Sequence, residues 1–400
     1  MPDKKRFLIL TSDSGFGHRS SANSIAKALT LQHPSDVEVS IVNPIFEESV
    51  ASFLKKAELS YDSNVKNHPA IYRFAYEISE SPSIKNLMED TLTFALQKTL
   101  RQMLTEWPPN AIASTNQMFN APVASVLSDL DLHIPFFTIV TDLAEVHAMW
   151  FNEGPDHYYV ASERVKAKAL TLGMDPDKIT ISGIPVDPAF KLSEASPQEM
   201  RLKLGIDPDL TTLLVVGSKR VSGIFENLVI LENISEPFQV VAIAGGDDDL
   251  NQRLNEHAWP FPIHVENYVD NVPEWMQAAD LLVTKAGGLI LSEGLAAGLP
   301  IILIDYLPGQ EEGNVDFILD NDAGVIAETP EIFYQTVASW LKEHQKRLTA
   351  RAQNARALGR PDAAIVIANA LWQAAENSIP TMPPSHRKSH EFQYHYNTKK

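Results

Sequence analysis

Short apolar runs alternate with longer amphipathic segments along the chain, and this alternation predicts parallel β-sheets covered by helices. In the first half, the apolar runs predict strands at residues 7–10, 37–42, 111–114, 136–140, 157–160 and 179–182. In the second half, they predict strands at residues 213–216, 238–242, 263–266, 281–284 and 301–304. Helical spacing of apolar residues predicts helices at 20–31, 84–107 and 191–205. Each half is therefore expected to form a doubly wound α/β unit.

Two prolines, Pro185 and Pro188, stiffen the connection between the halves, so we expect the first domain to span residues 1–188. Two such domains in series leave a cleft between them, and open α/β sheets bind ligands at the carboxyl ends of their strands. Residues 379–400 are rich in Pro, His and Lys without apolar periodicity, and we expect them to form a loose tail.

Composition and charge narrow the class of protein. The 400 residues are 44% hydrophobic and 21% charged, as in folded globular proteins, and the absence of Cys excludes disulfides and a catalytic thiol. A net charge of −18 argues against nucleic-acid binding and against broad adhesion to anionic membranes. The longest apolar region, 281–304, is interrupted by Lys285 and Glu293 and predicts no membrane span. The apolar run at 7–10 is too short for a signal peptide, so we expect a cytoplasmic protein.

The first candidate site is the loop at residues 11–19, between a predicted strand and helix. Gly15 and Gly17 allow a ligand to approach the backbone, and the following helix offers unpaired N–H groups to an oxyanion. His18 at this point could accept a proton near neutral pH. A tight turn with a surface histidine explains the same residues.

A second candidate follows the strand at 136–140. Asp142 and His147 come after its carboxyl end, where they could contact a substrate or orient another side chain. Helix capping by Asp142 and packing of His147 at the helix edge form the alternative.

The strongest local signal lies at residues 281–293. A buried strand leads into Gly287 and Gly288 and then a helix, whose N–H groups could hold a diphosphate with help from Lys285. Glu293, further along the helix, could accept hydrogen bonds from ribose hydroxyls. The alternative is an ordinary strand–turn–helix whose glycines only permit packing.

Two further clusters of polar residues each have a ligand-binding and a structural interpretation. Gln310, Glu311 and Asn314 follow the strand at 301–304 and suit the vicinal hydroxyls of a sugar, although a solvated loop is an equal alternative. The acidic residues 247–249 suggest a divalent metal, but helix capping explains them better, and we expect no metal site.

Taken in order, these motifs resemble glycosyltransferase family 28 enzymes of the monogalactosyldiacylglycerol synthase and processive diacylglycerol glucosyltransferase type. The resemblance extends from about residue 7 to residue 375. The matching segments are residues 12–19, 141–150, 183–186, 268–280, 285–293 and 308–314.

The resemblance implies a GT-B fold, with two Rossmann-like domains facing a cleft. The second domain, at 189–360, would bind the nucleotide sugar, and a helix at 361–378 would cross back to the first. The implied reaction is an inverting, metal-independent transfer of a hexose from a UDP-sugar to a lipid hydroxyl, and the implied acceptor is diacylglycerol. No cofactor is implied, and the oligomeric state is left open.

The resemblance also assigns roles to individual residues. His18 would be the base that deprotonates the acceptor, and Asp142 and His147 would lie on the acceptor side. The donor-binding residues would be Gly17, Lys219, Tyr268, Val269, Val272, Lys285, Gly287, Gly288, Leu289, Ile290, Glu293, Gln310, Glu311 and Asn314.

Several positions depart from the family pattern. Phe16 replaces a glycine, Lys219 and Arg220 replace small residues, and Ile290 stands where relatives tend to carry Thr. These departures motivate an alternative, a nucleotide-binding protein with altered catalysis on the same scaffold. A transferase with another acceptor and a nucleotide-sugar epimerase are further alternatives.

A lipid acceptor would require contact with a membrane, and residues 44–107 mix aromatic, aliphatic and basic side chains that could form an interfacial element. We therefore expect a cytoplasmic enzyme that could be peripheral at the inner face of the membrane. The alternative for most of these side chains is a helical hairpin packed in the core.

Overall fold

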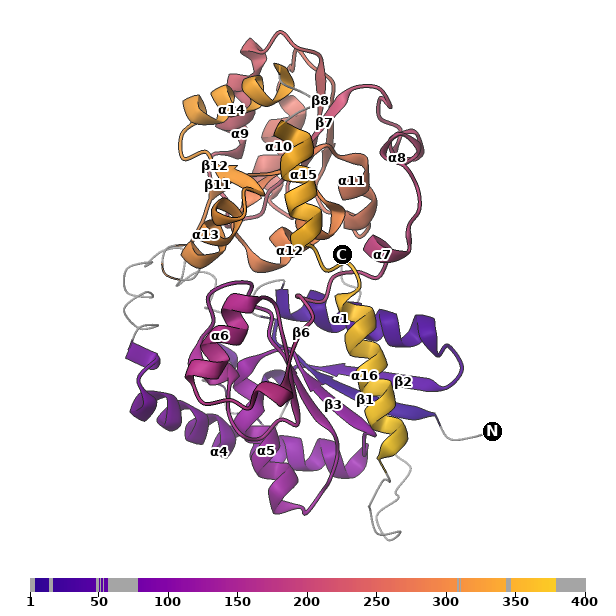
Figure 1. Cartoon of the computed structure of the whole chain (residues 1–400), viewed down its shortest axis with the longest axis vertical. Helices are drawn as coiled ribbons and strands as arrows, with labels where there is room; N and C mark the ends of the chain where they lie inside the picture. The colour runs from indigo at the N-terminus through magenta and orange to yellow at the C-terminus, as the bar shows by residue number, and fades with distance from the viewer. Residues whose placement is uncertain are drawn as a thin grey trace. The chain divides into compact units, whose positions relative to one another are not determined.

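A computed structural model describes residues 4–13, 17–47, 50, 52, 54–56, 78–307, 309, 311–342 and 347–378. The chain forms two compact units, each with its own sheet (Figure 1). The first comprises Met1–Asp142, Val146–Pro185 and Ala363–Lys400; the second comprises Leu143–Glu145 and Val186–Asp362. The division at residues 185 and 186 falls close to the predicted boundary at 188.

The first unit contains a six-stranded parallel sheet of order β2-β1-β3-β4-β5-β6. Its strands are β1 (Lys5–Leu10), β2 (Val37–Val42), β3 (Ala111–Ser114), β4 (Phe136–Ile139), β5 (His157–Val160) and β6 (Ile179–Ile181). Its helices are α1 (Gly17–Gln32), α4 (Pro82–Glu106), α5 (Asn120–Asp129), α6 (Glu163–Thr171) and α16 (Ala363–Asn377). Short 3₁₀ helices are η1 (Pro44–Phe46), η2 (Gln117–Phe119), η3 (Ala148–Trp150) and η4 (Pro176–Lys178).

The second unit repeats this architecture with the order β12-β11-β10-β7-β8-β9. Its strands are β7 (Thr211–Val216), β8 (Phe238–Ile243), β9 (Ile263–Glu266), β10 (Leu281–Lys285), β11 (Ile301–Asp305) and β12 (Gly324–Ile326). Its helices are α7 (Ala189–Leu192), α8 (Pro197–Leu204), α9 (Ile224–Ile230), η5 (Leu231–Asn233), α10 (Asp248–Glu256), α11 (Val272–Ala278), α12 (Gly288–Ala297), α13 (Glu312–Asp320), α14 (Pro330–Lys342) and α15 (Arg347–Leu358).

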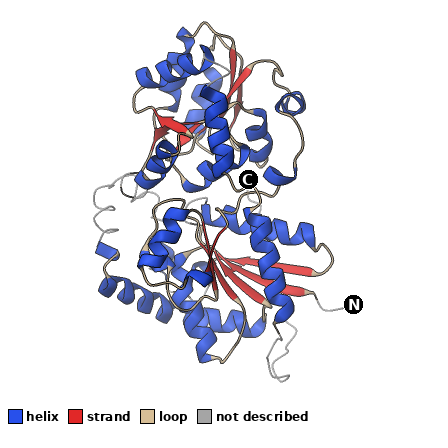
Figure 2. Ribbon diagram, in the orientation of Figure 1, coloured by secondary structure: helices blue, strands red, loops and turns tan. Residues whose placement is uncertain are grey.

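Alternation along the strands explains why helices cover both faces of each sheet (Figure 2). In β1, Phe7 and Ile9 pack with α1 and α16, whereas Leu8 and Leu10 pack with α4 and α5 on the other face. Successive strand residues point to opposite faces, so a central strand with helices on both sides must be apolar throughout. The predicted doubly wound α/β class is confirmed in both units.

Two elements differ from the sequence-based expectation. The predicted helix at 191–205 is wrong: α7 ends at Leu192, and α8 begins at Pro197 after a capping box formed by Ser196 and Glu199. Proline favours the first position of a helix because it lacks an N–H, so a new helix starts there. The short edge strand β12 was not predicted.

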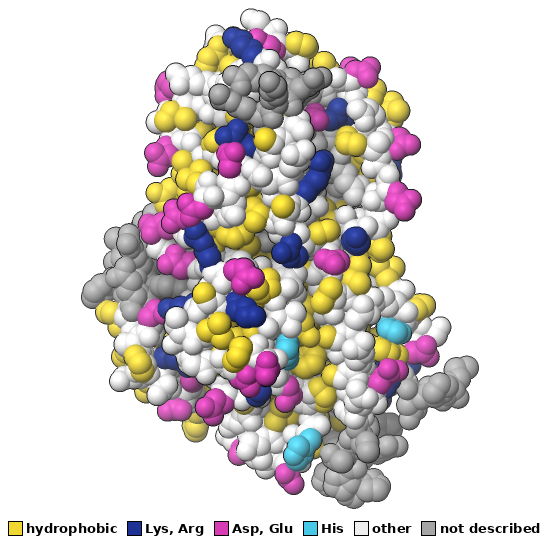
Figure 3. Space-filling view, in the orientation of Figure 1, with side chains coloured by type: hydrophobic (Ala, Val, Ile, Leu, Met, Phe, Trp, Pro, Cys, Tyr) yellow, Lys and Arg dark blue, Asp and Glu magenta, His cyan; other side chains and the backbone are white. Residues whose placement is uncertain are grey.

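Charged side chains of both signs are interspersed on the face of the molecule drawn in Figure 3, and the basic ones form no continuous patch on that face. None of the helices in the described ranges is long and apolar enough to cross a membrane.

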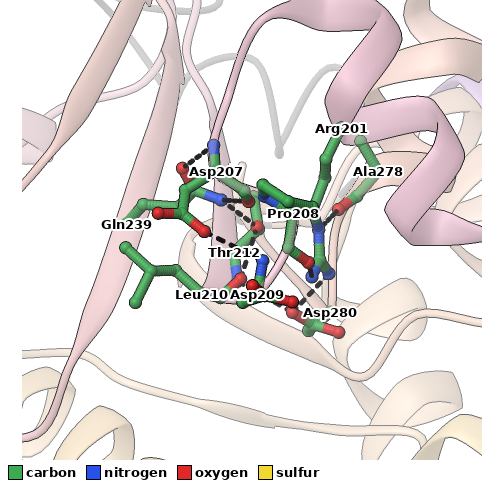
Figure 4. A network of polar contacts seen from close by, with 9 residues as sticks. All are labelled: Arg201, Asp207, Pro208, Asp209, Leu210, Thr212, Gln239, Ala278 and Asp280. Carbon is green, nitrogen blue, oxygen red and sulfur yellow. Dashed lines mark hydrogen bonds and ion pairs between the residues drawn. The ribbon is translucent and has the colours of Figure 1, made fainter.

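A polar network ties α8 to the second sheet (Figure 4). The Arg201 side chain is almost fully buried, and its guanidinium donates to Ala278 O at 2.7 Å, Pro208 O at 3.1 Å and Asp280 Oδ2 at 2.6 Å. Asp280 also accepts from Thr212 N at 2.8 Å, at the start of β7. The network therefore lies at the amino-terminal edge of the sheet, where it serves stability.

We expect Arg201→Met to lower the free energy of unfolding by about 2–4 kcal/mol, because it removes the donor to the Ala278 and Pro208 carbonyls and the charged partner of Asp280, which keeps only its bond from Thr212 N. Urea unfolding at pH 7 measures the loss. Lys203→Met is the control, because Lys203 forms an exposed pair with Glu274 and should cost less than about 1 kcal/mol. Equal effects of the two substitutions would contradict the role of the network.

Candidate active site

Polar groups of the first unit gather at the carboxyl edge of its sheet. Thr115 follows β3, Thr141 follows β4, and His18 is the second residue of α1, the helix after β1. Because the strands are parallel, their carboxyl ends share one edge, and residues far apart in sequence meet there.

The His18 ring is held through one of its two nitrogens. Nδ1 lies 2.7 Å from Thr115 O and 2.8 Å from Thr141 Oγ1. A carbonyl oxygen only accepts, so Nδ1 carries the hydrogen, and in the neutral ring the lone pair is on Nε2. Within the described part of the chain, Nε2 has no hydrogen-bond partner.

Burial keeps this imidazole uncharged. It lowers the pKa of His18 to about 4, although the bond to the Thr115 carbonyl acts in the opposite direction. At neutral pH the ring therefore has an unprotonated Nε2 that can accept a proton.

Asp142 accepts a hydrogen bond from the side chain of a tryptophan. Its Oδ2 accepts from Trp150 Nε1 at 2.6 Å, and burial raises the pKa of Asp142 to about 6 in spite of that bond. Trp150 is fully buried, with its ring centroid 6.2 Å from that of His18. Asp142 thus fixes an indole beside the imidazole, a role consistent with orienting another side chain.

His147 is buried and is used for capping. Its Nδ1 accepts from Met149 N at 3.1 Å, at the start of η3, and its Nε2 lies 2.9 Å from Ser79 Oγ. Burial lowers the pKa of His147, although the negative charge of Glu80 opposes this effect. Its proximity to an acceptor stays a prediction.

The glycine loop before α1 is only partly described, because Gly15 and Phe16 lie outside the described residues. Gly17 begins α1. Before the gap, Asp13 accepts from Arg19 Nε at 2.8 Å and from Asn43 Nδ2 at 2.9 Å. These bonds connect the end of β1 to the first turn of α1 and to the loop after β2.

In the second unit, the turn between β10 and α12 presents backbone donors. The bond from Leu291 N to Gly287 O, 3.1 Å, closes the first turn of α12. The N–H groups of Gly288, Leu289 and Ile290 therefore have no partner within the helix, and they lie at the positive end of its dipole. This arrangement can bind an anion.

The loop between β11 and α13 packs against the turn between β10 and α12. Lys285 Nζ pairs with Glu311 Oε1, and Asn314 Nδ2 donates to Ala286 O at 2.9 Å. Both Glu311 and Asn314 are buried. Gln310 lies outside the described residues. The structure thus brings Lys285, Glu311 and Asn314 together at the carboxyl ends of β10 and β11.

Glu293 is a buried carboxyl group on α12. Only 9% of its surface is exposed, and no hydrogen-bond or ion-pair partner exists for it among the residues described. Burial, together with the negative charge of Asp187, raises the pKa of Glu293 to about 8. A buried carboxyl group without a donor is costly, so this position suits a ligand that brings hydroxyl donors.

The remaining donor candidates also follow strands of the second sheet. Lys219 is exposed in the loop after β7. Tyr268 and Val269 lie between β9 and α11, with Tyr268 61% exposed, and Val272 is the first residue of α11. All of them therefore lie in loops or at a helix start after the carboxyl ends of strands, at the same edge as Lys285.

Asp305 at the end of β11 connects two of these loops. Its Oδ2 accepts from Ser222 N at 3.1 Å and from Ser222 Oγ at 3.2 Å, in the loop that contains Lys219. The sequence carried no signal for this contact, nor for the contacts of Thr115 and Thr141 with His18.

The acidic run at 247–249 caps a helix, as its alternative interpretation predicted. Asp247 Oδ1 accepts from Leu250 N at 3.1 Å at the start of α10, and Asp248 accepts from Asn267 Nδ2 at 2.8 Å. The described ranges contain no cluster of three His, Asp or Glu side chains arranged to hold a metal ion.

Comparison with known proteins identifies the family. Residues 18–186 match the family model described as monogalactosyldiacylglycerol (MGDG) synthase, and residues 212–367 match the glycosyltransferase family 28 C-terminal domain. Monogalactosyldiacylglycerol synthase 3, chloroplastic, of Arabidopsis thaliana is 32% identical over 369 residues, which cover 90% of this chain and 79% of the relative.

Solved structures share the fold. MurG of Acinetobacter baumannii superposes with a TM-score of 0.58 at 14% identity, over 92% of this chain and 99% of that one. A putative UDP-N-acetylglucosamine 2-epimerase from Listeria monocytogenes gives a TM-score of 0.59 at 14% identity, over 94% and 98%. At this identity the likeness concerns the fold alone.

Fold and sequence together define an enzyme, a glycosyltransferase of the GT-B class. The chain belongs to the monogalactosyldiacylglycerol synthase family. The predicted family and fold are confirmed.

We expect Glu293→Gln to stabilise the ligand-free protein at alkaline pH. The pKa of Glu293 is about 8 in the folded protein and near its ordinary value when unfolded, so wild-type stability falls as pH rises from about 4.5 to 8. At pH 8.5 the variant should be more stable by on the order of 4–5 kcal/mol, with little difference at pH 4.5.

Thermal or urea unfolding across this pH range measures the effect. Glu194→Gln, at an exposed position, is the control and should leave the pH dependence unchanged. Parallel pH profiles for wild type and Glu293→Gln would contradict an unpaired, buried carboxyl group.

Proposed function

We propose that the protein transfers a hexose from a UDP-sugar to the hydroxyl of diacylglycerol, with inversion at the anomeric carbon. The observation that carries the proposal is the carboxyl edge of the second sheet, where the α12 N-terminus, Lys285 and the unpartnered Glu293 lie in one strand–turn–helix. The names of the family model and of the relative from Arabidopsis thaliana supply the acceptor and favour galactose as the sugar.

Each part of a UDP-sugar has a counterpart at this edge. The N–H groups of Gly288 to Ile290 and the Lys285 ammonium suit the diphosphate, which must accept negative charge as it leaves. Ribose hydroxyls would give the Glu293 carboxylate the donors that it lacks. Tyr268 to Val272 would line the uracil site, and Gln310 and Asn314 would face the sugar.

His18 is the proposed base. Its unprotonated Nε2 takes the proton of the acceptor hydroxyl while the oxygen forms a bond to the anomeric carbon and the bond from that carbon to UDP breaks. A neutral histidine needs no counter-charge, and the diphosphate charge would be met by backbone N–H groups and a lysine. We therefore propose that the reaction requires no metal ion.

We expect His18→Ala to lower the rate of transfer by at least about 10²–10⁴-fold, while the affinity for UDP stays within about threefold, because a base acts in the transition state. The assay is UDP release from UDP-galactose and UDP-glucose with vesicles containing diacylglycerol, with EDTA present. UDP affinity is measured by calorimetry on the same protein.

Several results would contradict the proposal. Loss of UDP binding in His18→Ala would remove the assignment of the base, and transfer that stops with EDTA would remove metal independence. Release of UDP that does not depend on diacylglycerol would point to another acceptor. Conversion of the UDP-sugar without any acceptor would indicate an epimerase.

Diacylglycerol resides in bilayers, and α4 offers an apolar face for contact with one. Ile84, Leu87, Met88 and Phe94 are 36%, 62%, 38% and 87% exposed and recur at helical spacing. The opposite face, with Leu96 and Leu100, packs in the core. We propose that this exposed face lies against the membrane, so that the protein is peripheral. A cytoplasmic location stays a prediction, since the relative from Arabidopsis thaliana is named as chloroplastic.

We expect Leu87→Ser combined with Phe94→Ser to weaken vesicle binding by about tenfold, because both side chains would lose burial in the interface. Vesicle flotation measures binding, and transfer to detergent-dispersed acceptor should be unchanged. Leu202→Ser, at an equally exposed position on α8, is the control. Unchanged flotation of the double variant would contradict the assignment of this face.

A further inference from the structure

Lys285 and Glu311 form an ion pair that is almost completely shielded from water. Their side chains are 14% and 9% exposed, and Lys285 Nζ contacts Glu311 Oε1 directly. Removing two charges from water is costly unless both are paired, so the pair must form whenever these loops fold as observed.

Both carboxylate oxygens of Glu311 already accept a hydrogen bond within the fold. Its Oε1 accepts from Lys285, and its Oε2 accepts from Leu307 N at 2.9 Å. The backbone N of Glu311 donates to Leu307 O at 2.9 Å. Two hydrogen bonds with the backbone of Leu307 therefore fix Glu311, one through its side chain and one through its main chain. A side chain held in this way is suited to position a neighbour.

Lys285, the neighbour that Glu311 contacts, is directed toward the start of α12. A Cβ atom placed on Gly287 would lie 3.4 Å from Lys285 Nζ, so the ammonium passes close over the glycine that precedes the helix. The register between β10 and β11 shifts between Thr284 and Lys285, which pairs Lys285 with Asp305. Such an irregularity re-aims a side chain at the end of a strand.

We propose that Glu311 is a positioning residue, which holds the Lys285 ammonium at the α12 N-terminus for the diphosphate, in place of the sugar contact that the family resemblance implies. The inference rests on the proposed function, because the diphosphate belongs to the UDP-sugar. Glu311 also offsets the lysine charge before a nucleotide binds, and so moderates the attraction of Lys285 for the diphosphate that UDP and the UDP-sugar share.

The two roles make different predictions for Glu311→Gln. If Glu311 positions Lys285, the loss of its charge should tighten UDP and UDP-galactose by the same factor, about threefold to tenfold, while kcat falls. If Glu311 binds the sugar, UDP affinity should be unchanged and only UDP-galactose should weaken. Calorimetry on the full chain compares the two ligands directly.

The matched controls use neighbouring positions. Glu312→Gln removes the same charge one residue further along and should leave both affinities unchanged. In a Lys285→Met background, Glu311→Gln should no longer tighten UDP, because its effect passes through the lysine. Additive effects of the two substitutions would overturn the proposal.

A second readout does not depend on the nucleotide. Mild acetylation followed by mass spectrometry should find Lys285 protected in wild type and at least about tenfold more reactive in Glu311→Gln, because its ammonium is no longer buried in a pair. Glu311→Asp, whose carboxylate is one methylene further from the lysine, should also raise the reactivity. Unchanged reactivity in either variant would overturn the proposal.

These measurements separate the two hypotheses. If the wild-type protein binds neither UDP nor UDP-galactose, the proposed function fails, and the acetylation of Lys285 still decides whether Glu311 holds it. If wild type binds both and Glu311→Gln alters UDP-galactose alone, the proposed function survives and the positioning role fails.

Discussion

The parallel pairing of every strand is the constraint on which the candidate active site depends. In a parallel sheet all carboxyl ends lie at one edge, and the chain leaves that edge into the amino end of a helix. Thr115 and Thr141, separated from His18 by 97 and 123 residues, meet its ring for this reason. In the second unit the same rule places an open helix N-terminus and the loops after β7, β9 and β11 at one edge.

His18 shows how a backbone group can prepare a base. The Thr115 carbonyl accepts the Nδ1 hydrogen, which selects the tautomer with its lone pair on Nε2. A carboxylate in that position would select the same tautomer but would also add a negative charge and favour the imidazolium. Using a carbonyl keeps the ring neutral in a buried place, at the cost of a weaker base.

Most of the fold could be predicted from the sequence, because apolar runs of four or more residues mark buried parallel strands. The exception, β12, starts with a glycine and has only two apolar residues, Val325 and Ile326, too few for a pattern. The break between α7 and α8 had a readable signal in Ser196 and Pro197, which form a helix start.

The candidate site was predictable in its residue types but not in its pairings. His18, Asp142, Lys285 and Glu293 all follow strands, so their edge could be inferred from order alone. The contact of His18 with Thr115 uses a backbone oxygen, which no residue identity reveals. The pair of Lys285 with Glu311 depends on the register shift between β10 and β11, which only the folded sheets define.

Lys285 at the end of β10 and Glu293 in the middle of α12 are both largely shielded from water, yet the fold compensates only one of them. Lys285 receives a carboxylate from the next loop, so its burial is compensated within the fold. Glu293 receives no donor from the described residues and faces the added repulsion of Asp187. A carboxyl group left in this state lowers stability at neutral pH, and hydroxyl donors from a bound ribose would remove that penalty on binding. The unpaired carboxyl group of Glu293 would thus lower the stability of the ligand-free protein and raise its affinity for the UDP-sugar. Nucleotide binding and stability would be coupled through this one residue.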